Sequence, residues 1–101
     1  MKKLLITGFD PFGGESINPA WEAVRLLPDV IRDFELVKLE IPTVFGAAAQ
    51  VVIDKAEEIH PDAIISVGQA GGRAAVTPEM VGINLRYASI PDNMGALPCD
   101  I

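Results

Sequence analysis

The chain has 101 residues, 50% of them hydrophobic, and its 8 Lys and Arg against 14 Asp and Glu give a formal net charge of −6. This length allows one compact domain at most, and apolar segments that recur along the whole chain exclude a disordered protein. An acidic balance without a basic cluster argues against nucleic acid and against an anionic membrane as partners, because both attract Lys and Arg.

The sequence also indicates a compartment. No stretch approaches the ~20 apolar residues of a membrane helix, and the apolar run near Met1 is broken by Gly8 and Asp10, too early for a signal peptide. A single cysteine, Cys99, forbids an internal disulfide and fits a reducing environment. We therefore expect a cytoplasmic protein.

The chain begins with a predicted strand, a glycine-rich loop and a helix. Residues 4–7 form a short apolar run that predicts a strand buried on both faces. After the loop at residues 8–15, Asn18 and Pro19 suit the N-cap and first position of a helix, expected over residues 19–27.

The middle of the chain predicts two more strands around a second helix. Residues 34–41 alternate between apolar and charged, which indicates a strand with one wetter face near a sheet edge. Residues 63–67 are a continuous apolar run, hence a third strand buried on both faces. Between these strands, apolar residues recur at the spacing of one helical stripe, which predicts a helix that ends before His60. These residues are Phe45, Ala48, Ala49, Val52, Ala56 and Ile59.

Strands that alternate with helices predict a parallel sheet with covering helices, and function is then expected at the carboxyl ends of the strands. Glycine-rich loops lie there, at residues 8–15 and 68–73. A β-like stretch at residues 80–85 and turn residues at 90–95 follow, and the chain is expected to end in a loop. Two helices are few to cover both faces of such a sheet, so we infer a half-built domain.

The glycine-rich loops do not fit a nucleotide site, because neither has the spacing of a dinucleotide or P-loop motif and no Lys follows either one. Tight turning and close backbone packing explain these glycines better. Phe9 and Phe12 are either core plugs or the wall of an apolar pocket. Glu79 either belongs to the functional edge of the sheet or is a surface carboxylate.

Neither the histidine nor the cysteine is assigned a catalytic role from the residues. His60 ends a helix, where it is expected to cap. A Cys/His pair needs its side chains within hydrogen-bond reach, and His60 is expected at the end of the sheet opposite the loops. Cys99 therefore has no expected partner.

Several motifs together resemble the pyroglutamyl peptidase I family, also called pyrrolidone-carboxylate peptidases. The resemblance covers the whole chain. The motifs are GFDPFGGE at residues 8–15, NPAWEAV at 18–24, PTVF at 42–45, VGQAGGR at 67–73, TPE at 77–79 and IPDNMG at 90–95.

The resemblance implies an α/β fold, a three-layer αβα sandwich with a mostly parallel sheet, of which residues 1–101 form about the first half. It implies a cytoplasmic, homo-oligomeric cysteine exopeptidase that removes an N-terminal pyroglutamyl residue from peptides, with no metal or cofactor. By position, Glu79 would orient the catalytic histidine, Phe9 and Phe12 would hold the lactam ring, and Asn18 and Gln69 would line or support the pocket. A small, flat, uncharged ring suits aromatic walls with a few amide contacts.

The sequence departs from the family pattern at the catalytic positions and at one arginine. The family's nucleophilic cysteine and its histidine belong to a second half, Cys99 falls on a variable position, and His60 matches no catalytic position. Ser89 replaces a family arginine, although Arg86 is near. The alternatives are an inactive half-domain that binds pyroglutamate or a partner half, and a swapped oligomer whose copies cover each other's sheet faces.

Overall fold

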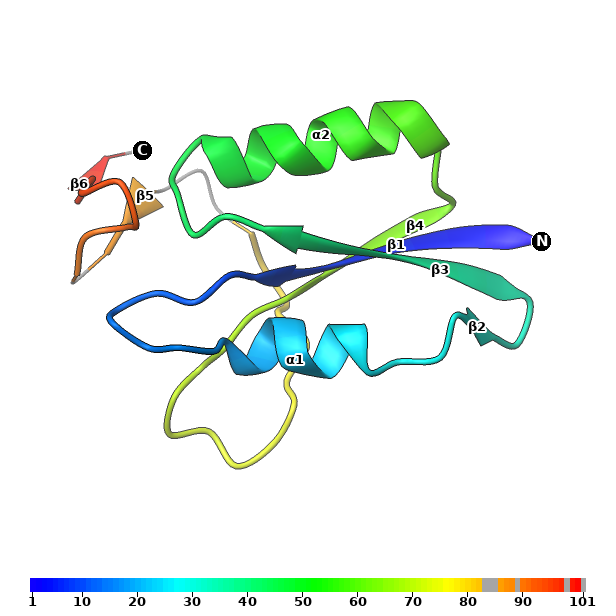
Figure 1. Ribbon diagram of the computed structural model, residues 1–101, viewed down its shortest axis with the longest axis horizontal. Coiled ribbons are helices and arrows are strands. Elements are labelled where there is room, and N and C mark those ends of the chain that lie inside the picture. The colour runs from blue at the N-terminus through cyan, green and yellow to red at the C-terminus, as the bar shows by residue number, and fades with distance from the viewer. Residues whose placement is uncertain (83–85, 89, 98, 101) are drawn as a thin grey trace.

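The structure is a computed structural model that describes residues 1–82, 86–88, 90–97 and 99–100. Its main body is a sheet with one helix on each face, as Figure 1 shows. In chain order the described elements are β1 (Lys2–Phe9), α1 (Pro19–Arg25), β2 (Val30–Ile31), β3 (Phe34–Ile41), α2 (Ala47–Ile59), β4 (Ala63–Val67), β5 (Arg86–Tyr87) and β6 (Cys99–Asp100).

The sheet is mostly parallel, as predicted. Its described strands lie in the order β2-β3-β1-β4, with β3 and β4 parallel to β1 and the short β2 antiparallel to β3. The chain passes from β1 to β3 on one side and then returns past β1 to β4 on the other. The strand order therefore changes direction between β1 and β4, and the carboxyl ends of these two strands are where doubly wound sheets place a ligand crevice.

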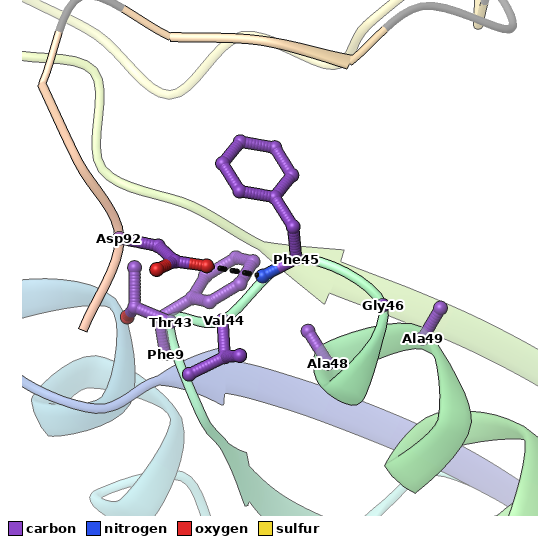
Figure 2. A pocket seen from close by; sticks show the side chains of 8 residues that line it. All are labelled: Phe9, Thr43, Val44, Phe45, Gly46, Ala48, Ala49 and Asp92. Atoms are coloured by element: carbon purple, nitrogen blue, oxygen red, sulfur yellow. Dashed lines mark hydrogen bonds between the residues drawn. The ribbon is translucent and has the colours of Figure 1, made fainter. Parts of the chain in front are cut away.

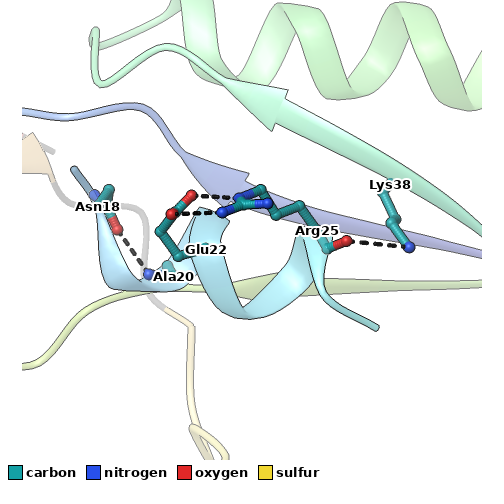
Figure 3. Close-up of polar contacts among 5 residues, drawn as sticks. All are labelled: Asn18, Ala20, Glu22, Arg25 and Lys38. Carbon is teal, nitrogen blue, oxygen red and sulfur yellow. Dashed lines mark hydrogen bonds and ion pairs between the residues drawn. The ribbon is translucent and has the colours of Figure 1, made fainter. Parts of the chain in front are cut away.

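Helix α1 is held at both ends by polar side chains (Figure 3). At its start the Oδ1 atom of Asn18 accepts a 2.9 Å hydrogen bond from the Ala20 amide, which confirms the predicted N-cap. At its end the Nζ atom of Lys38 donates to the Arg25 carbonyl at 3.4 Å. Lys38 lies on the predicted wetter face of β3, where its charge satisfies carbonyls that the helix leaves unpaired.

The hydrophobic core lies between α1 and the sheet and centres on β1. Leu5 and Thr7 of β1 are fully buried, which confirms the predicted burial of this strand. Ile6, Val24 and Leu36 form the buried cluster on the α1 side. Partly buried side chains packed against that cluster are Leu4, Trp21, Leu27, Phe34 and Val67.

Strand β4 has the predicted bounds, but the prediction that it is buried on both faces is wrong for this chain. Ile64 and Ile65 are each 47% exposed. The physical reason is position, because β4 is an edge strand and no described strand pairs with its outer side. Helix α2 contacts β3 and none of its residues is buried, so its apolar stripe covers the sheet only in part.

The chain exposes more surface than a compact protein of its size. Its accessible surface is 7210 Å², whereas a folded monomer of 10.8 kDa has about 5,500 Å². Its radius of gyration is 14.3 Å, against about 13 Å for a compact domain of this length. This surplus agrees with the inference of a half-built domain, which stays a prediction.

The last part of the chain differs from the sequence-based expectation. β5 and β6 form an antiparallel pair where an ending in a loop was predicted, so that prediction is wrong. Of the β-like stretch at residues 80–85, residues 80–82 form no strand, and 83–85 lie outside the described residues, as does Ser89. The predicted turn at 90–95 is confirmed by a 3.0 Å bond from the Gly95 amide to the Asp92 carbonyl.

Candidate active site

Four loops gather at the carboxyl ends of β1, β3 and β4. Figure 1 shows them at the side of the sheet opposite the N-terminus. They are residues 10–18 after β1, residues 42–46 after β3, residues 68–80 after β4, and the turn at residues 90–97. The predicted functional edge of the sheet is therefore the edge where the loops lie.

An open hollow of about 730 Å³ lies between the end of β1 and the loop that follows β4. Phe9 forms part of its wall, and Gln69 and Glu79 line it as well. The structure thus brings together three of the five side chains to which the sequence assigns a role, although 70 positions separate the first from the last. Phe12 and Asn18 do not line this hollow among the residues described.

Glu79 is presented to solvent by a local polar contact. The Nη1 atom of Arg73 donates a 2.9 Å hydrogen bond to the Thr77 hydroxyl and lies 3.6 Å from the Glu79 Oε1 atom. The Glu79 side chain is 79% exposed. An exposed ion pair of this kind contributes little stability, and the Glu79 carboxylate stays accessible from solvent.

A second cavity of about 410 Å³ lies between the end of β1 and the start of α2 (Figure 2). Phe9 lines this cavity too, so its half-buried ring separates the two spaces. That position favours a pocket wall over a core plug for Phe9. The residues that line the second cavity are Phe9, Thr43, Val44, Phe45, Gly46, Ala48, Ala49 and Asp92.

Asn18 and Phe12 lie in the loop that leads from β1 to α1. Asn18 is only 3% exposed, and its Nδ2 atom donates to the Asp10 carbonyl at 3.1 Å while its Oδ1 atom caps the helix. Both of its polar atoms are engaged, so it supports the loop and does not face a ligand. Phe12 is half-buried, and its carbonyl accepts from the Glu15 amide at 3.2 Å in a turn.

Asp10, to which the sequence assigned no role, joins the loops after β1 and β3. Its Oδ1 atom accepts hydrogen bonds from the Thr43 amide at 2.7 Å and from the Thr43 hydroxyl at 2.8 Å. The same oxygen accepts a 3.1 Å bond from the Nδ2 atom of Asn93. An Asp-Pro pair directly after a buried strand was the available signal, because aspartate in such turns bonds backbone amides.

Asp92 was also missed, although its turn was predicted. Its Oδ2 atom accepts from the Phe45 amide at 2.8 Å, as Figure 2 shows. Its Oδ1 atom accepts from the Met94 amide at 2.9 Å and the Ala96 amide at 2.8 Å. Hydrogen bonds from these backbone amides, that of Phe45 foremost, lower the pKa of the Asp92 carboxyl.

His60 lies at the opposite edge of the sheet, as predicted. It is the C-cap of α2, with a left-handed backbone (φ 48°), and its amide donates to the Ala56 carbonyl at 2.8 Å. The backbone places Cys99 in β6. Within the part of the chain that the structure describes, no three His, Cys, Asp or Glu side chains are arranged to hold a metal ion, and no helix is long and apolar enough to cross a membrane.

Comparison with known proteins identifies the family. The family model described as pyroglutamyl peptidase matches residues 2–101. A pyrrolidone-carboxylate peptidase of Clostridium perfringens is 60% identical over 99 residues, which are 98% of this chain and 46% of that protein. One from Lactobacillus acidophilus is 58% identical over 95% of this chain and 48% of its own length.

Solved structures of the family share the fold. The crystal structure of pyroglutamyl peptidase I from Bacillus amyloliquefaciens superposes with a TM-score of 0.93 at 50% identity, over 99% of this chain and 49% of that one. Pyrrolidone carboxyl peptidase from Pyrococcus furiosus gives 0.90 at 43% identity, over 98% and 48%. The chain therefore spans about half the length of these relatives. Its match to the family model and the identity of its sequence to these peptidases show that it belongs to the pyroglutamyl peptidase family.

Proposed function

We propose that this chain supplies the ring-binding part of a cysteine exopeptidase that removes an N-terminal pyroglutamyl residue from peptides. The observation that carries the proposal is the shared hollow of Phe9, Gln69 and Glu79 at the carboxyl ends of β1 and β4. Membership of a peptidase family supports it, because the relatives bear the name pyrrolidone-carboxylate peptidase.

The chemistry of the hollow suits a lactam ring. The aromatic face of Phe9 offers apolar contact to a flat ring, and Phe12, three positions along the same loop, is the second proposed aromatic contact. The Gln69 amide can donate to the ring carbonyl and accept from the ring N–H. Asn18 supports this arrangement through the loop, because its Nδ2 atom donates to the carbonyl of Asp10, the residue after Phe9.

Glu79 is the proposed orienting carboxylate of a Cys-His-Glu triad. A carboxylate at this place fixes the tautomer of the histidine and stabilises the imidazolium that forms when the thiol loses its proton. His60 lies at the far edge of the sheet, so the imidazole and the thiolate come from polypeptide equivalent to the relatives' other half. No metal or cofactor takes part in this scheme, and we propose a cytoplasmic location.

Hydrolysis of a pyroglutamyl anilide tests the activity. The assay uses a full-length protein in which this chain replaces the corresponding half of the Bacillus amyloliquefaciens peptidase. Glu79→Gln is expected to lower kcat by at least about a hundredfold, because a neutral side chain no longer fixes the tautomer of the histidine or stabilises its cation. Glu57→Gln, on helix α2, is the matched control and keeps the parent rate. An unchanged rate for Glu79→Gln would show that the role assigned to this residue is wrong.

Ligand binding tests the ring site in the 101-residue chain itself. Titration with 2-pyrrolidinone is expected to shift the amide resonances of Phe9 and Gln69, whereas proline, which carries a charged amine, leaves them in place. Gln69→Ala weakens the binding, and Gln50→Ala, on helix α2, does not. Equal responses to the lactam and to proline would refute a site for an uncharged ring.

The exposed edge of β4 favours self-association as a second property. Ile64 and Ile65 are half exposed beside an outer edge with which no described strand pairs, and β4 carries no charged residue that would repel a second copy. The surplus of exposed surface, about 1,700 Å² by comparison with a compact monomer, exceeds the ~800 Å² per partner of a standard interface. We propose that copies of the chain pair through β4, and light scattering that showed a stable monomer of 10.8 kDa would refute this.

A further inference from the structure

Two aspartates outside the assigned site connect three loops that are distant in sequence. Asp10 follows β1, Thr43 follows β3, and Asn93 lies in the turn near the end of the chain. Asp10 accepts hydrogen bonds from both of the other residues, and the Asn93 amide donates to the Thr43 carbonyl at 3.0 Å. We call Asp10, Thr43, Asp92 and Asn93 the loop clamp.

The clamp is closed by charge-assisted bonds. Both oxygens of Asp92 are engaged by backbone amides, one by Phe45 across the sheet edge and the other by Met94 and Ala96 within the turn. Bonds to an ionised acceptor are about twice as strong as bonds between neutral groups. The turn is thus attached to the loop after β3 at Phe45 and Thr43, and through the Nδ2 atom of Asn93 to the loop after β1, at the Pro11 carbonyl, 3.0 Å away.

The clamp borders the 410 Å³ cavity through Phe9 and Phe45. Phe9 directly precedes Asp10, and Phe45 carries the amide that Asp92 binds. Both rings line the 410 Å³ cavity, and Asp92 lines it too (Figure 2). Because its oxygens are already bonded, Asp92 does not serve as a ligand group for the substrate. Its effect is on the position of the Phe9 and Phe45 rings that line this cavity.

We propose that Asp10 and Asp92 are positioning residues for Phe9, whose ring lines both the 410 Å³ cavity and the 730 Å³ hollow proposed for the lactam. They hold the turn at residues 90–97 against the loops after β1 and β3, and this fixes the position of the Phe9 ring at the end of β1. The inference rests on the proposed function, because the lactam ring is proposed to contact Phe9 in the 730 Å³ hollow.

The test compares three variants of the ¹⁵N-labelled chain with the parent. Asp92→Asn removes the charge, and Asn93→Ala removes the connection at an exposed residue whose loss leaves the core intact. Asp54→Asn is the control, because this aspartate lies on α2 and bonds Gln50. The measurements are hydrogen exchange of the Phe45 amide, the Kd for 2-pyrrolidinone, and the unfolding midpoint.

The expected result separates positioning from simple stabilisation. Asp92→Asn and Asn93→Ala speed exchange of the Phe45 amide, the first about tenfold, as for loss of a bond to a charged acceptor. Both weaken lactam binding several-fold while the unfolding midpoint of Asn93→Ala stays near that of the parent. Unchanged lactam affinity in both variants, or unchanged exchange of Phe45, would overturn the proposal. Failure of the parent chain to bind lactam would instead count against the proposed function, and the exchange of Phe45 would still decide whether the clamp exists.

Discussion

Replacing Gly8 with alanine is expected to destabilise the chain by about 3 kcal/mol, the upper part of the range for overpacking. A Cβ atom at this position would lie 2.7 Å from the Cα atom of Trp21 and 2.8 Å from its nitrogen, with the carbonyl carbon of Ala20 at 3.0 Å. These obstacles are helix backbone, which cannot turn aside as a flexible side chain can. Strand β1 and helix α1 must therefore separate, and the cluster around Val24 loosens with them.

Gly68→Ala is the matched control for this substitution. Gly68 follows β4 at the same edge of the sheet, and an added Cβ there meets no atom within 4 Å. Its substitution is expected to change the free energy of unfolding by less than about 0.5 kcal/mol, as is usual for surface positions. Comparison of Gly8→Ala with Gly68→Ala therefore separates the effect of close packing between β1 and α1 from any general effect of alanine at a strand end.

Urea unfolding followed by far-UV circular dichroism measures both variants. Trp21, the chain's single tryptophan, gives a second signal at the contact itself. A loss of about 3 kcal/mol is a large part of the 5–15 kcal/mol that stabilises a typical domain, so the midpoint for Gly8→Ala moves strongly. A loss within 0.5 kcal/mol of that for Gly68→Ala would refute the close-packing argument.

Further predictions concern the cap, a buried hydroxyl, one carboxylate and the sheet edge. Asn18→Ala is expected to lower the free energy of unfolding by about 1–2 kcal/mol, because it removes the N-cap and the bond to Asp10; urea unfolding measures it. Thr7→Val is expected to raise the free energy of unfolding by about 1 kcal/mol, and the urea midpoint with it, since the buried Thr7 hydroxyl has no partner among the described residues. Because folding lowers the pKa of the Asp92 carboxyl, its contribution to stability is present above an unfolded pKa of about 3.9 and is lost as the pH falls through the lower folded value. Titration of the Phe45 amide chemical shift with acid is expected to show this transition, and Asp92→Asn is expected to abolish it. Ile65→Lys is expected to shift any oligomer of the chain toward monomer in light scattering, because a charge on an edge strand opposes pairing.

Local sequence patterns were enough for the main elements. Residues 34–41 and 63–67 were predicted as strands and form β3 and β4 with those bounds, because Pro42 and Gly68 end the runs that the alternation and the apolar composition begin. The N-cap at Asn18 was likewise readable, since Asn followed by Pro at the first helical position is a local signal. Strand bounds and helix caps depend on residues that are adjacent in the sequence, so the sequence alone is enough to predict them.

Burial and long-range contacts were not readable in the same way. The run Ala63–Val67 is apolar enough for a central strand, yet its exposure is set by which strand lies beside it, and that is a property of the whole sheet. The bond from Asn93 to Asp10 spans 83 positions, and no periodicity reports a contact of that separation. The meeting of Phe9, Gln69 and Glu79 was predictable only because parallel strands bring their following loops to one edge. The roles assigned to these three residues, to Phe12 and to Asn18 stay predictions.

The last two residues of β1, Gly8 and Phe9, and Asp10 directly after them connect the stability of the chain to its candidate site. Gly8 packs against α1, Phe9 lines both cavities, and Asp10 accepts hydrogen bonds from the loop after β3 and from the turn at residues 90–97. Alternation along a strand sends neighbouring residues to opposite faces, so one short segment can serve the core and the pocket at once. The two effects are therefore separable by substitution: Gly8→Ala should shift the unfolding midpoint, whereas Asp10→Asn should act mainly on exchange of the Thr43 amide and on lactam affinity. Asp10→Asn could instead lower the unfolding midpoint as much as Gly8→Ala and leave lactam affinity unchanged. The loops would then stabilise the fold and not the pocket, and the proposed separation of the two effects would be wrong.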